Sequence, residues 1–248
     1  MKNYKLSLNA AKSKYIIFHP KSKKIEKINL LIDGIEIEQV PTFNFLGLSI
    51  DQHLDWNSHL SKISAKIARA SGIINRFKNF LQDYIALSIY NTLVLPHINY
   101  NITLWGHHSD KIFKQQKKAV RLVACQRYNS HIDPIFKALN LLKIRDIYKL
   151  SLLKFYYDHS KSTLPLSLQN IKFTTNSDIH SHNTRTLLAL TKPKVRHNFA
   201  KNAMSYAIPN LINDTPNTIL SKIDTHSRKG FSTYAKRIFI QTYPKSAV

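Results

Sequence analysis

The spacing of apolar residues changes at Trp56, and this change limits the folds open to the chain. Before Trp56, apolar and polar residues alternate, as in Ile35-Glu36-Ile37-Glu38, which is typical of strands with one buried face. After Trp56, apolar residues recur every three or four positions, which is typical of amphipathic helices. We therefore predict an α+β fold: a small N-terminal antiparallel β-sheet, residues 1–55, followed by two mainly helical regions, residues 56–125 and 126–248.

Turn residues separate the strands of the predicted sheet. Asp33-Gly34 lies between two apolar runs and supplies the positive φ angles of a tight primed turn, so it predicts a hairpin. Gly47, inside a further predicted strand, marks a bulge or a close backbone approach. The predicted strands are residues 15–18, 28–32, 35–40 and 43–50.

Apolar periodicity and capping residues predict the helices. Asn57 or Ser58 can cap the first helix, and Pro134 suits the first turn of another. Between residues 159 and 193, Ser, Thr, Asn, His and Pro dominate, which predicts a long loop with little regular structure. The predicted helices are residues 57–81, from 83 to near Pro96, from Ser109 onward, from Ile132 onward, 144–157, 196–207 and 227–243.

The chain is strongly basic, with a formal charge of +23. The excess rises along the chain, from +2 in residues 1–55 to +8 in 56–125 and +13 in 126–248. Such a charge attracts polyanions, of which nucleic acid is the simplest, and salt weakens the attraction. A basic surface without a partner is the alternative interpretation.

Several classes of protein are excluded by composition. The single cysteine, Cys125, can form neither an intrachain disulfide nor a zinc finger. Five scattered glycines provide no glycine-rich phosphate loop. No run of 18 apolar residues occurs, so we expect neither a secreted precursor nor a membrane-spanning protein. We expect an intracellular protein, and the residues do not distinguish cytoplasm from nucleus.

No pattern predicts a catalytic site or a metal site. Asp51 and Asp55 flank a strand-to-helix turn, where Asp usually caps the helix or forms the turn. His107-His108 and His180-x-His182 lack neighbours that would complete a four-ligand zinc site. We therefore expect no catalytic residue, metal or cofactor in this chain.

Rows of cations mark two of the predicted helices. On the first, Lys62, Lys66 and Arg69 share one face, which Arg76 continues, and acidic partners are missing. Such a row either faces solvent or binds phosphates, and we favour phosphate contact without base readout. The second row, on the helix after Ser109, consists of Lys111, Lys114, Lys117, Lys118 and Arg121.

Two further groups have alternative interpretations. Arg185, within residues 180–185, either anchors the long loop or contacts a phosphate. A set of aromatic residues follows helical spacing and belongs to the core rather than to a stacking platform. These aromatic residues are Tyr148, Phe155, Tyr156 and Tyr157.

An ordered set of short motifs runs along nearly the whole chain. It comprises Leu8-Asn9, Lys12-Ser13, residues 15–18, Asp33-Gly34, Phe45-Leu46-Gly47, Ile50-Asp51, Trp56, His59-Leu60, Ile89-Tyr90, Leu95-Pro96, Leu104-Trp105-Gly106, Gln116-Lys117, Ala119-Val120-Arg121, residues 180–185 and residues 227–236. This order resembles the distal part of a reverse transcriptase of non-LTR retrotransposons, of the jockey-like or LINE-like kind.

The resemblance implies roles for several residues. Lys12 would belong to the lysine motif of the polymerase palm, and Phe45-Leu46-Gly47 to the strand-turn that grips the primer end. The helices from Trp56 onward would form the thumb and a C-terminal extension. In the family, the thumb follows the backbone of the duplex of RNA template and DNA primer, so Lys62, Lys66 and Arg69 would contact phosphates.

The resemblance also implies what this chain lacks. In the family, the catalytic carboxylates lie on upstream palm strands that include an Ala-Asp-Asp turn, whereas this chain has no Asp-Asp pair. Two-metal catalysis requires such carboxylates. We therefore expect a fragment that holds template and primer but is inactive alone, with Mg²⁺ and the palm and fingers segment belonging to the intact polymerase. The alternative is a free-standing basic nucleic-acid-binding or scaffolding protein derived from a retroelement.

Overall fold

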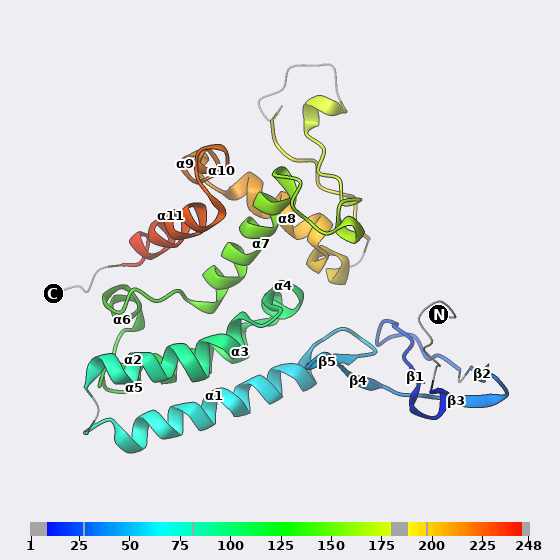
Figure 1. The fold of residues 1–248 in the computed structure, drawn as a ribbon, viewed down its shortest axis with the longest axis horizontal. Helices are drawn as coiled ribbons and strands as arrows, with labels where there is room; N and C mark the ends of the chain where they lie inside the picture. Colours follow the sequence, from blue (N-terminus) through cyan, green and yellow to red (C-terminus); the bar gives the residue numbers. More distant parts are fainter. Residues whose placement is uncertain (1–8, 27, 81, 180–187, 197, 245–248) are drawn as a thin grey trace. The chain divides into compact units, whose positions relative to one another are not determined.

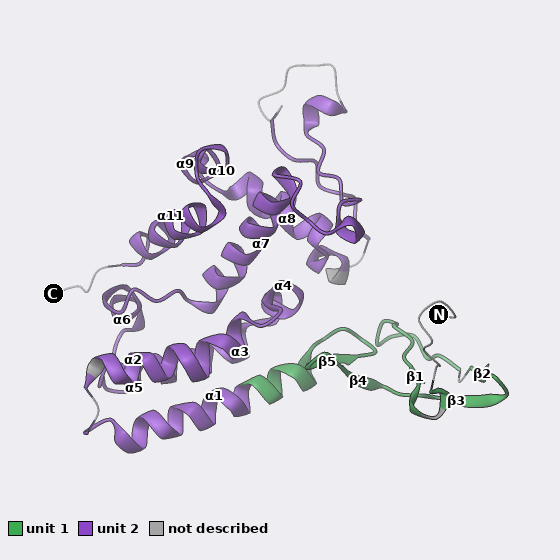
Figure 2. Ribbon diagram, viewed as in Figure 1, with its two compact units in different colours: residues 1–63 green, residues 64–248 purple. Residues whose placement is uncertain are grey.

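The computed structural model describes residues 9–26, 28–80, 82–179, 188–196 and 198–244 (Figure 1). The chain divides into two compact units, residues 1–63 and 64–248 (Figure 2). Strands lie in the first unit and helices make up most of the second. The predicted α+β class, with N-terminal strands followed by helices, is confirmed.

The N-terminal unit contains two small groups of strands. Asp33 and Gly34 have φ angles of 51° and 78° and close the β2–β3 hairpin, so the predicted primed turn is confirmed. β1 pairs in parallel with the other side of β3, which gives the order β1-β3-β2. The elements are η2 (Ala10–Lys12), β1 (Lys14–Tyr15), β2 (Leu30–Ile32), β3 (Ile35–Gln39), β4 (Thr42–Phe45) and β5 (Leu48–Asp51).

Residues 43–50 form a second hairpin rather than the single bulged strand that we predicted. β4 and β5 pair antiparallel, with Phe45 opposite Leu48. The two residues between them, Leu46 and Gly47, have φ angles of 46° and 82°. The prediction was wrong because a Leu at the first turn position gives no turn signal in the sequence, and its left-handed backbone is costly for a branched side chain.

Helices follow from residue 57 onward, and most begin where the sequence signals predicted. α1 begins at Asn57, α6 at Ile132 and α7 at Ile144, while Ser227 caps α11 by accepting a hydrogen bond from the Gly230 N–H. The elements to residue 160 are α1 (Asn57–Phe77), α2 (Asp83–Ile89), η3 (Tyr90–Val94), α3 (Leu95–Asn99), α4 (Ile102–Trp105), η4 (Gly106–His108), α5 (Asp110–Val123), α6 (Ile132–Ala138) and α7 (Ile144–Ser160). Beyond them lie η5 (Leu166–Leu168), η6 (Asn176–Asp178), η7 (Asn198–Asn202), α8 (Met204–Asp214), α9 (Asn217–Leu220), α10 (Lys222–Thr225) and α11 (Arg228–Gln241).

We predicted that the second helix stops near Pro96, but the helical backbone does not end there. The helical backbone continues from α2 through η3, a single stretch of π-helix, into α3. In η3 the Leu95 N–H donates to the Tyr90 carbonyl five residues earlier. Pro96 then falls in the first turn of α3, directly after the π-helical stretch, where a proline is tolerated.

The C-terminal half differs from prediction in the helix over residues 196–207 and in two short helices that we did not predict, α9 and α10. In place of a helix over residues 196–207, η7 is followed by an extended residue, Ala203, and then by α8, which continues to Asp214. In the described part of residues 161–193, regular structure amounts to two 3₁₀ turns and one β-bridge between Thr175 and Leu190. That part of the chain is therefore mostly loop, as predicted.

The core of the second unit forms around α7. α7 packs against α4, α8 and α11 (Figure 1). Trp105, Phe136 and Phe231, from three other helices, are completely buried. Burying large aromatic side chains on this scale stabilises a unit by itself.

Candidate nucleic-acid interface

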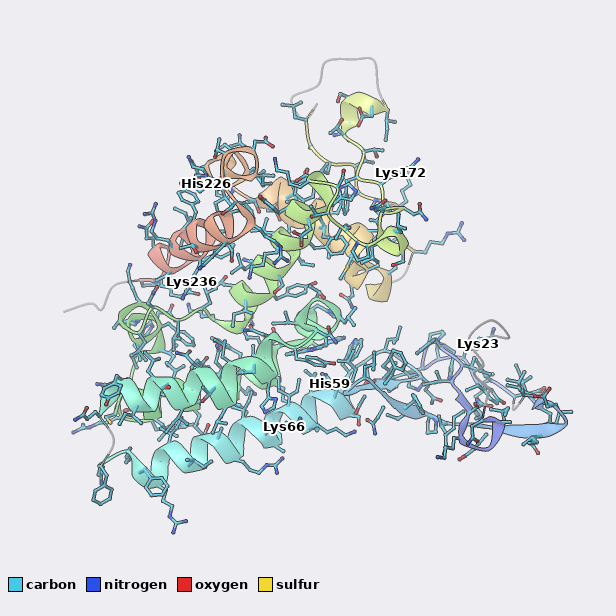
Figure 3. All side chains as sticks on the ribbon, viewed as in Figure 1. Lys23, His59, Lys66, Lys172, His226 and Lys236 are labelled. Atoms are coloured by element: carbon cyan, nitrogen blue, oxygen red, sulfur yellow. The ribbon has the colours of Figure 1, made fainter. Side chains whose placement is uncertain are left out.

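The C-terminal part of α1 turns its cations to solvent because its apolar residues recur at helical spacing. Ile67, Ala70 and Ile74 are buried, whereas Lys66 and Arg69 are exposed. Lys66 is labelled on α1 in Figure 3. No carboxylate of a described residue lies within ion-pair distance of these two cations. The positive field at this face is therefore not neutralised by a neighbouring acid.

His97 of α3 lies within electrostatic reach of the same face. Partial burial lowers the pKa of His97, and the positive charges of Lys66 and Arg69 lower it further. The imidazole is therefore neutral near pH 7 and can donate a hydrogen bond without adding charge. This histidine could not be identified as a site residue from sequence, because it follows Arg69 by 28 residues and belongs to a different helix.

Lys62 has a different environment from its neighbours on α1. Its Nζ donates to Asn44 Oδ1 at 2.7 Å and to Ser49 Oγ at 2.5 Å, and both acceptors belong to the β4–β5 hairpin. Ser49 is buried, and its hydroxyl lies 2.6 Å from Asn44 Oδ1. The Lys62 ammonium therefore holds the hairpin to the start of α1 within the N-terminal unit, and only one of its three N–H groups is left for a phosphate.

Arg76 ends the row on α1 beside an exposed aromatic ring. Its guanidinium carbon lies 5.9 Å from the centre of the Phe77 ring, and both side chains are exposed. A guanidinium held over a ring keeps its charge and its planar donor groups available. Arg76 can therefore contact a phosphate without losing a partner.

The cations of α5 divide into two groups. Lys114 and Lys118 are four residues apart and exposed, which gives a second cationic row. Lys117 is half-buried, with its ammonium 5.0 Å from the Phe113 ring. Lys111 is exposed as well, so these three lysines, but not Lys117, have the exposure that phosphate contact requires.

We predicted that Arg121 faces outward, but its guanidinium group is bound to the loop that follows α5. Its Nε and Nη2 donate to the Ser130 carbonyl at 3.0 and 2.9 Å, and its guanidinium lies 5.8 Å from the Tyr128 ring. The side chain is half-buried and closes the loop after α5. The prediction was wrong because helical spacing cannot reveal an acceptor that lies in the loop beyond the helix.

The tip of the β4–β5 hairpin is apolar and exposed. Phe45 and Leu46 are 54% and 74% exposed, and Gly47 completes the turn. Leu46 adopts a left-handed backbone that is costly for its side chain, and such strain concentrates at functional positions. Lys12, the remaining predicted residue of this unit, is exposed on η2.

Several described carboxylates have structural partners. Asp51 is buried and accepts hydrogen bonds from the backbone N–H groups of His53, Asp55 and Trp56 at 3.0, 3.1 and 2.9 Å. It therefore shapes the strand-to-helix turn, as predicted. Four aspartates of the second unit form ion pairs, which are Asp133–Lys143, Asp110–Arg145, Asp224–Lys161 and Asp158–Arg228.

Asp55 completes this turn on its outer side. It accepts from the Asn57 N–H and pairs with Lys21 at 2.7 Å. Burial alone would raise the pKa of Asp55, but the hydrogen bonds and charge of Lys21, together with the Asn57 N–H, lower it to about 2. Among the described residues, no three or more His, Cys, Asp or Glu side chains come together as metal ligands.

The remaining predicted groups are placed as follows. Arg185 lies outside the described residues. Tyr157 is buried, stacks on Phe231 with ring centres 5.3 Å apart and donates to the His226 carbonyl at 2.8 Å, so it belongs to the core. Tyr148, Phe155 and Tyr156 are half-buried on the same helix.

No protein-family model, curated protein or solved structure matches this chain. Within the described ranges, no helix is both long and apolar enough to span a membrane. The arrangement of the residues themselves therefore carries the functional argument.

Proposed function

We propose that this chain is the duplex-binding part of a reverse transcriptase of a non-LTR retrotransposon, comprising the end of the palm, the thumb and a C-terminal extension. The observation that carries the proposal is the exposed, uncompensated row on α1, Lys66 and Arg69, with His97 beside it. The motif order in the sequence supports the polymerase assignment. The partner is a duplex of RNA template and DNA primer.

Phosphates are the natural counterpart of the α1 row. Like charges one helical turn apart repel each other by a few tenths of a kcal/mol per pair. Each phosphate contact relieves this repulsion and releases condensed counterions, so affinity falls as salt rises. Contacts of this kind fix the position of a duplex without reading its bases.

The apolar hairpin tip supports a second contact. Leu46 and Phe45 offer apolar surface without donors, which suits the sugar and base faces at a primer end rather than phosphates. We propose that Phe45-Leu46-Gly47 contacts the primer end while α1 contacts the duplex backbone. The strained backbone at Leu46 supports a function for the tip.

The N-terminal unit has properties that favour a protein partner. Several large apolar side chains are exposed in it, and exposed apolar surface is typical of protein–protein contacts. We propose that the palm and fingers of the polymerase cover this surface and supply the catalytic carboxylates with their Mg²⁺. Apart from the hairpin tip, which is assigned to the primer end, the exposed residues are Phe18, Ile28, Leu30, Leu31, Ile35 and Phe43.

A second candidate is a free-standing basic protein that binds nucleic acid or acts as a scaffold. The observation that favours it is the well-filled core of the second unit, with Trp105, Phe136 and Phe231 completely buried. A unit with its own core is able to fold and bind without a polymerase.

The test of duplex binding compares two double variants. Replacing Lys66 and Arg69 with Ala should reduce the slope of log K against log salt by about 1.8, because each lost phosphate contact on DNA removes about 0.9. The matched control replaces Lys23 and Lys24, two exposed lysines of the N-terminal unit, with Ala. An unchanged slope in the first variant, or an equal reduction in the control, would contradict the proposal.

Circular dichroism of each variant excludes loss of the fold as the cause. Polymerase assays then separate the two candidates. The purified chain should not incorporate nucleotides on a primed template with Mg²⁺, but should bind a separately supplied palm and fingers segment of such a polymerase. Incorporation by the chain alone would contradict the first candidate, and absence of binding to that segment would favour the second.

A further inference from the structure

A pocket of about 540 Å³ opens in the second unit, lined by residues of α2, η3, α3, α7 and α11 and of the turn after α6. None of its lining residues belongs to α1. Two lysines, Lys154 of α7 and Lys236 of α11, reach it from different helices (Figure 3 labels Lys236). The remaining lining residues are Leu87, Asn91, Leu95, Asn99, Leu139, Asn140, Leu141, Leu142, Ile147, Leu150 and Ser151. None of these lining residues carries a carboxylate.

Lys154 is half-buried, and no described carboxylate forms an ion pair with it. Burial lowers its pKa, and the nearby Arg228 lowers it further, against a weaker opposing effect of Asp158. Asp158 is already held by Arg228, whose Nε and Nη2 donate to its two oxygens at 2.6 and 2.8 Å. The one acidic group that favours the Lys154 cation is therefore committed to another partner.

Lys236 has an environment similar to that of Lys154. It is half-buried, and burial lowers its pKa, with no acidic group of the described residues acting against this effect. A half-buried ammonium without a counter-charge is costly, and nearby like charges add to the cost. An anion between Lys154 and Lys236 would remove this cost at both positions.

The rest of the lining defines the shape and chemistry of that anion. Asn91, Asn99, Asn140 and Ser151 supply neutral hydrogen-bond donors beside the two ammonium groups. Leucine and isoleucine side chains form the remaining wall. This combination suits a group with several acceptor oxygens attached to an apolar or aromatic body, which is the chemistry of a nucleotide.

We propose that this pocket binds the phosphate group of a nucleotide between Lys154 and Lys236, with the sugar and base against the apolar wall. The nucleotide is either a free mononucleotide or one residue of a single strand. The proposal is independent of duplex binding by α1, because it depends on different residues and on a ligand too small to require both surfaces.

The test uses adenosine monophosphate, adenosine and hexathymidylate as probes, with dissociation constants measured by calorimetry on the full chain. Adenosine monophosphate should bind and adenosine should bind at least tenfold more weakly if the pocket takes a free nucleotide. If hexathymidylate alone binds, the pocket takes a nucleotide within a strand. In either case, replacing both Lys154 and Lys236 with Met should weaken binding of the active probe at least tenfold.

Matched variants keep this test decisive. Lys149→Met removes an exposed lysine from the same helix outside this pocket and should leave binding within twofold. Lys154→Arg with Lys236→Arg keeps both charges and should retain binding. Thermal unfolding of the Met variant should begin no lower than in the wild type, because two costly cations are gone.

Two results would overturn the proposal. The first is a wild-type chain that binds neither adenosine monophosphate nor hexathymidylate, and the second is equal affinity in the wild type and the Met variant. Neither result affects the proposal of duplex binding, provided that the Lys66 and Arg69 variant still shows a reduced slope of log K against log salt. Conversely, loss of the α1 effect with an intact response to Lys154 and Lys236 would overturn only the duplex proposal.

Discussion

The side-chain Nε2 of Gln116 donates a hydrogen bond to the phenolic oxygen of Tyr90 at 3.0 Å, and both residues are completely buried. The same amide nitrogen donates to the Leu142 carbonyl at 2.9 Å, and Oε1 accepts from the Ile144 N–H at 2.8 Å. Burial raises the pKa of Tyr90 to about 12, although the Gln116 bond acts in the opposite direction. One polar side chain thus joins α5 to the π-helical stretch and to the first residue of α7.

Replacing Gln116 with Leu should lower the free energy of unfolding by about 2–4 kcal/mol. Leu fills a similar volume, but it leaves the Leu142 carbonyl and the Ile144 N–H buried without their partner, and each such group costs about 1–3 kcal/mol. Denaturant unfolding of the two proteins measures the difference.

Gln115→Leu is the matched control, because Gln115 is the preceding residue of α5 and is only half-buried. It should change the free energy of unfolding by less than about 0.5 kcal/mol, as is usual for substitutions away from buried networks. Equal losses in the two variants would show that the buried hydrogen bonds of Gln116 do not stabilise the fold.

Lys62→Met should destabilise the β4–β5 hairpin while leaving the salt dependence of duplex binding nearly unchanged. The ammonium of Lys62 is bound to Asn44 and Ser49, so its removal deprives two hairpin side chains of a donor. Faster amide hydrogen exchange in β4 and β5 is the expected result, because local openings expose the backbone more often. Exchange and salt-titrated binding on the same preparation measure both effects.

Lys66→Met should give the reverse pattern. Its ammonium is exposed on the same helix, so exchange in β4 and β5 should stay as in the wild type while the binding slope falls by about 0.9. If Lys62→Met reduces the slope as much as Lys66→Met does, Lys62 is a phosphate ligand despite its bonds to the hairpin.

The stability of the second unit should decline as pH falls from about 6.5 to about 4. Both ring nitrogens of His107 are buried without a hydrogen-bond partner among the described residues. Burial, followed by the neighbouring His108, lowers the pKa of His107 from 6.5 to about 4. The unfolded chain therefore takes up a proton in this interval before the folded chain does, and the folded state loses stability as pH falls.

His107→Leu should remove this part of the pH dependence. The variant should be at least as stable as the wild type at pH 7, because the two unpartnered nitrogens are gone. The difference between the two curves of unfolding free energy against pH isolates His107 from the other histidines. Parallel curves between pH 4 and 6.5 would refute the assignment.

Elements defined by local signals could be predicted from sequence. The Asp33-Gly34 turn, the start of α7 at Ile144 and the Ser227 cap of α11 each depend on residues within a few positions of one another. The second hairpin could not be predicted, because its turn uses Leu46, a residue that rarely adopts positive φ. The continuation past Pro96 was also hidden, since it depends on a π-helical stretch whose Tyr90 is held by Gln116.

In the candidate interface, too, some features could be predicted from sequence and others could not. Exposure of Lys66 and Arg69 follows from their position opposite an apolar stripe, which helical spacing alone predicts. The engagement of Arg121 could not be predicted, because its acceptor lies in the loop that follows α5.

By itself, the amino-acid sequence determined the α+β class, the positions of most helices and the large cationic excess, since backbone propensity, capping and charge are properties of residues near one another in the chain. Only the tertiary structure shows which cations are available to bind a ligand. In it, Lys62 is hydrogen-bonded to the β4–β5 hairpin, and Lys154 and Lys236 line one pocket although they are 82 residues apart in sequence. Such pairings depend on which helices pack together, and packing is set by the buried core rather than by the charged residues themselves.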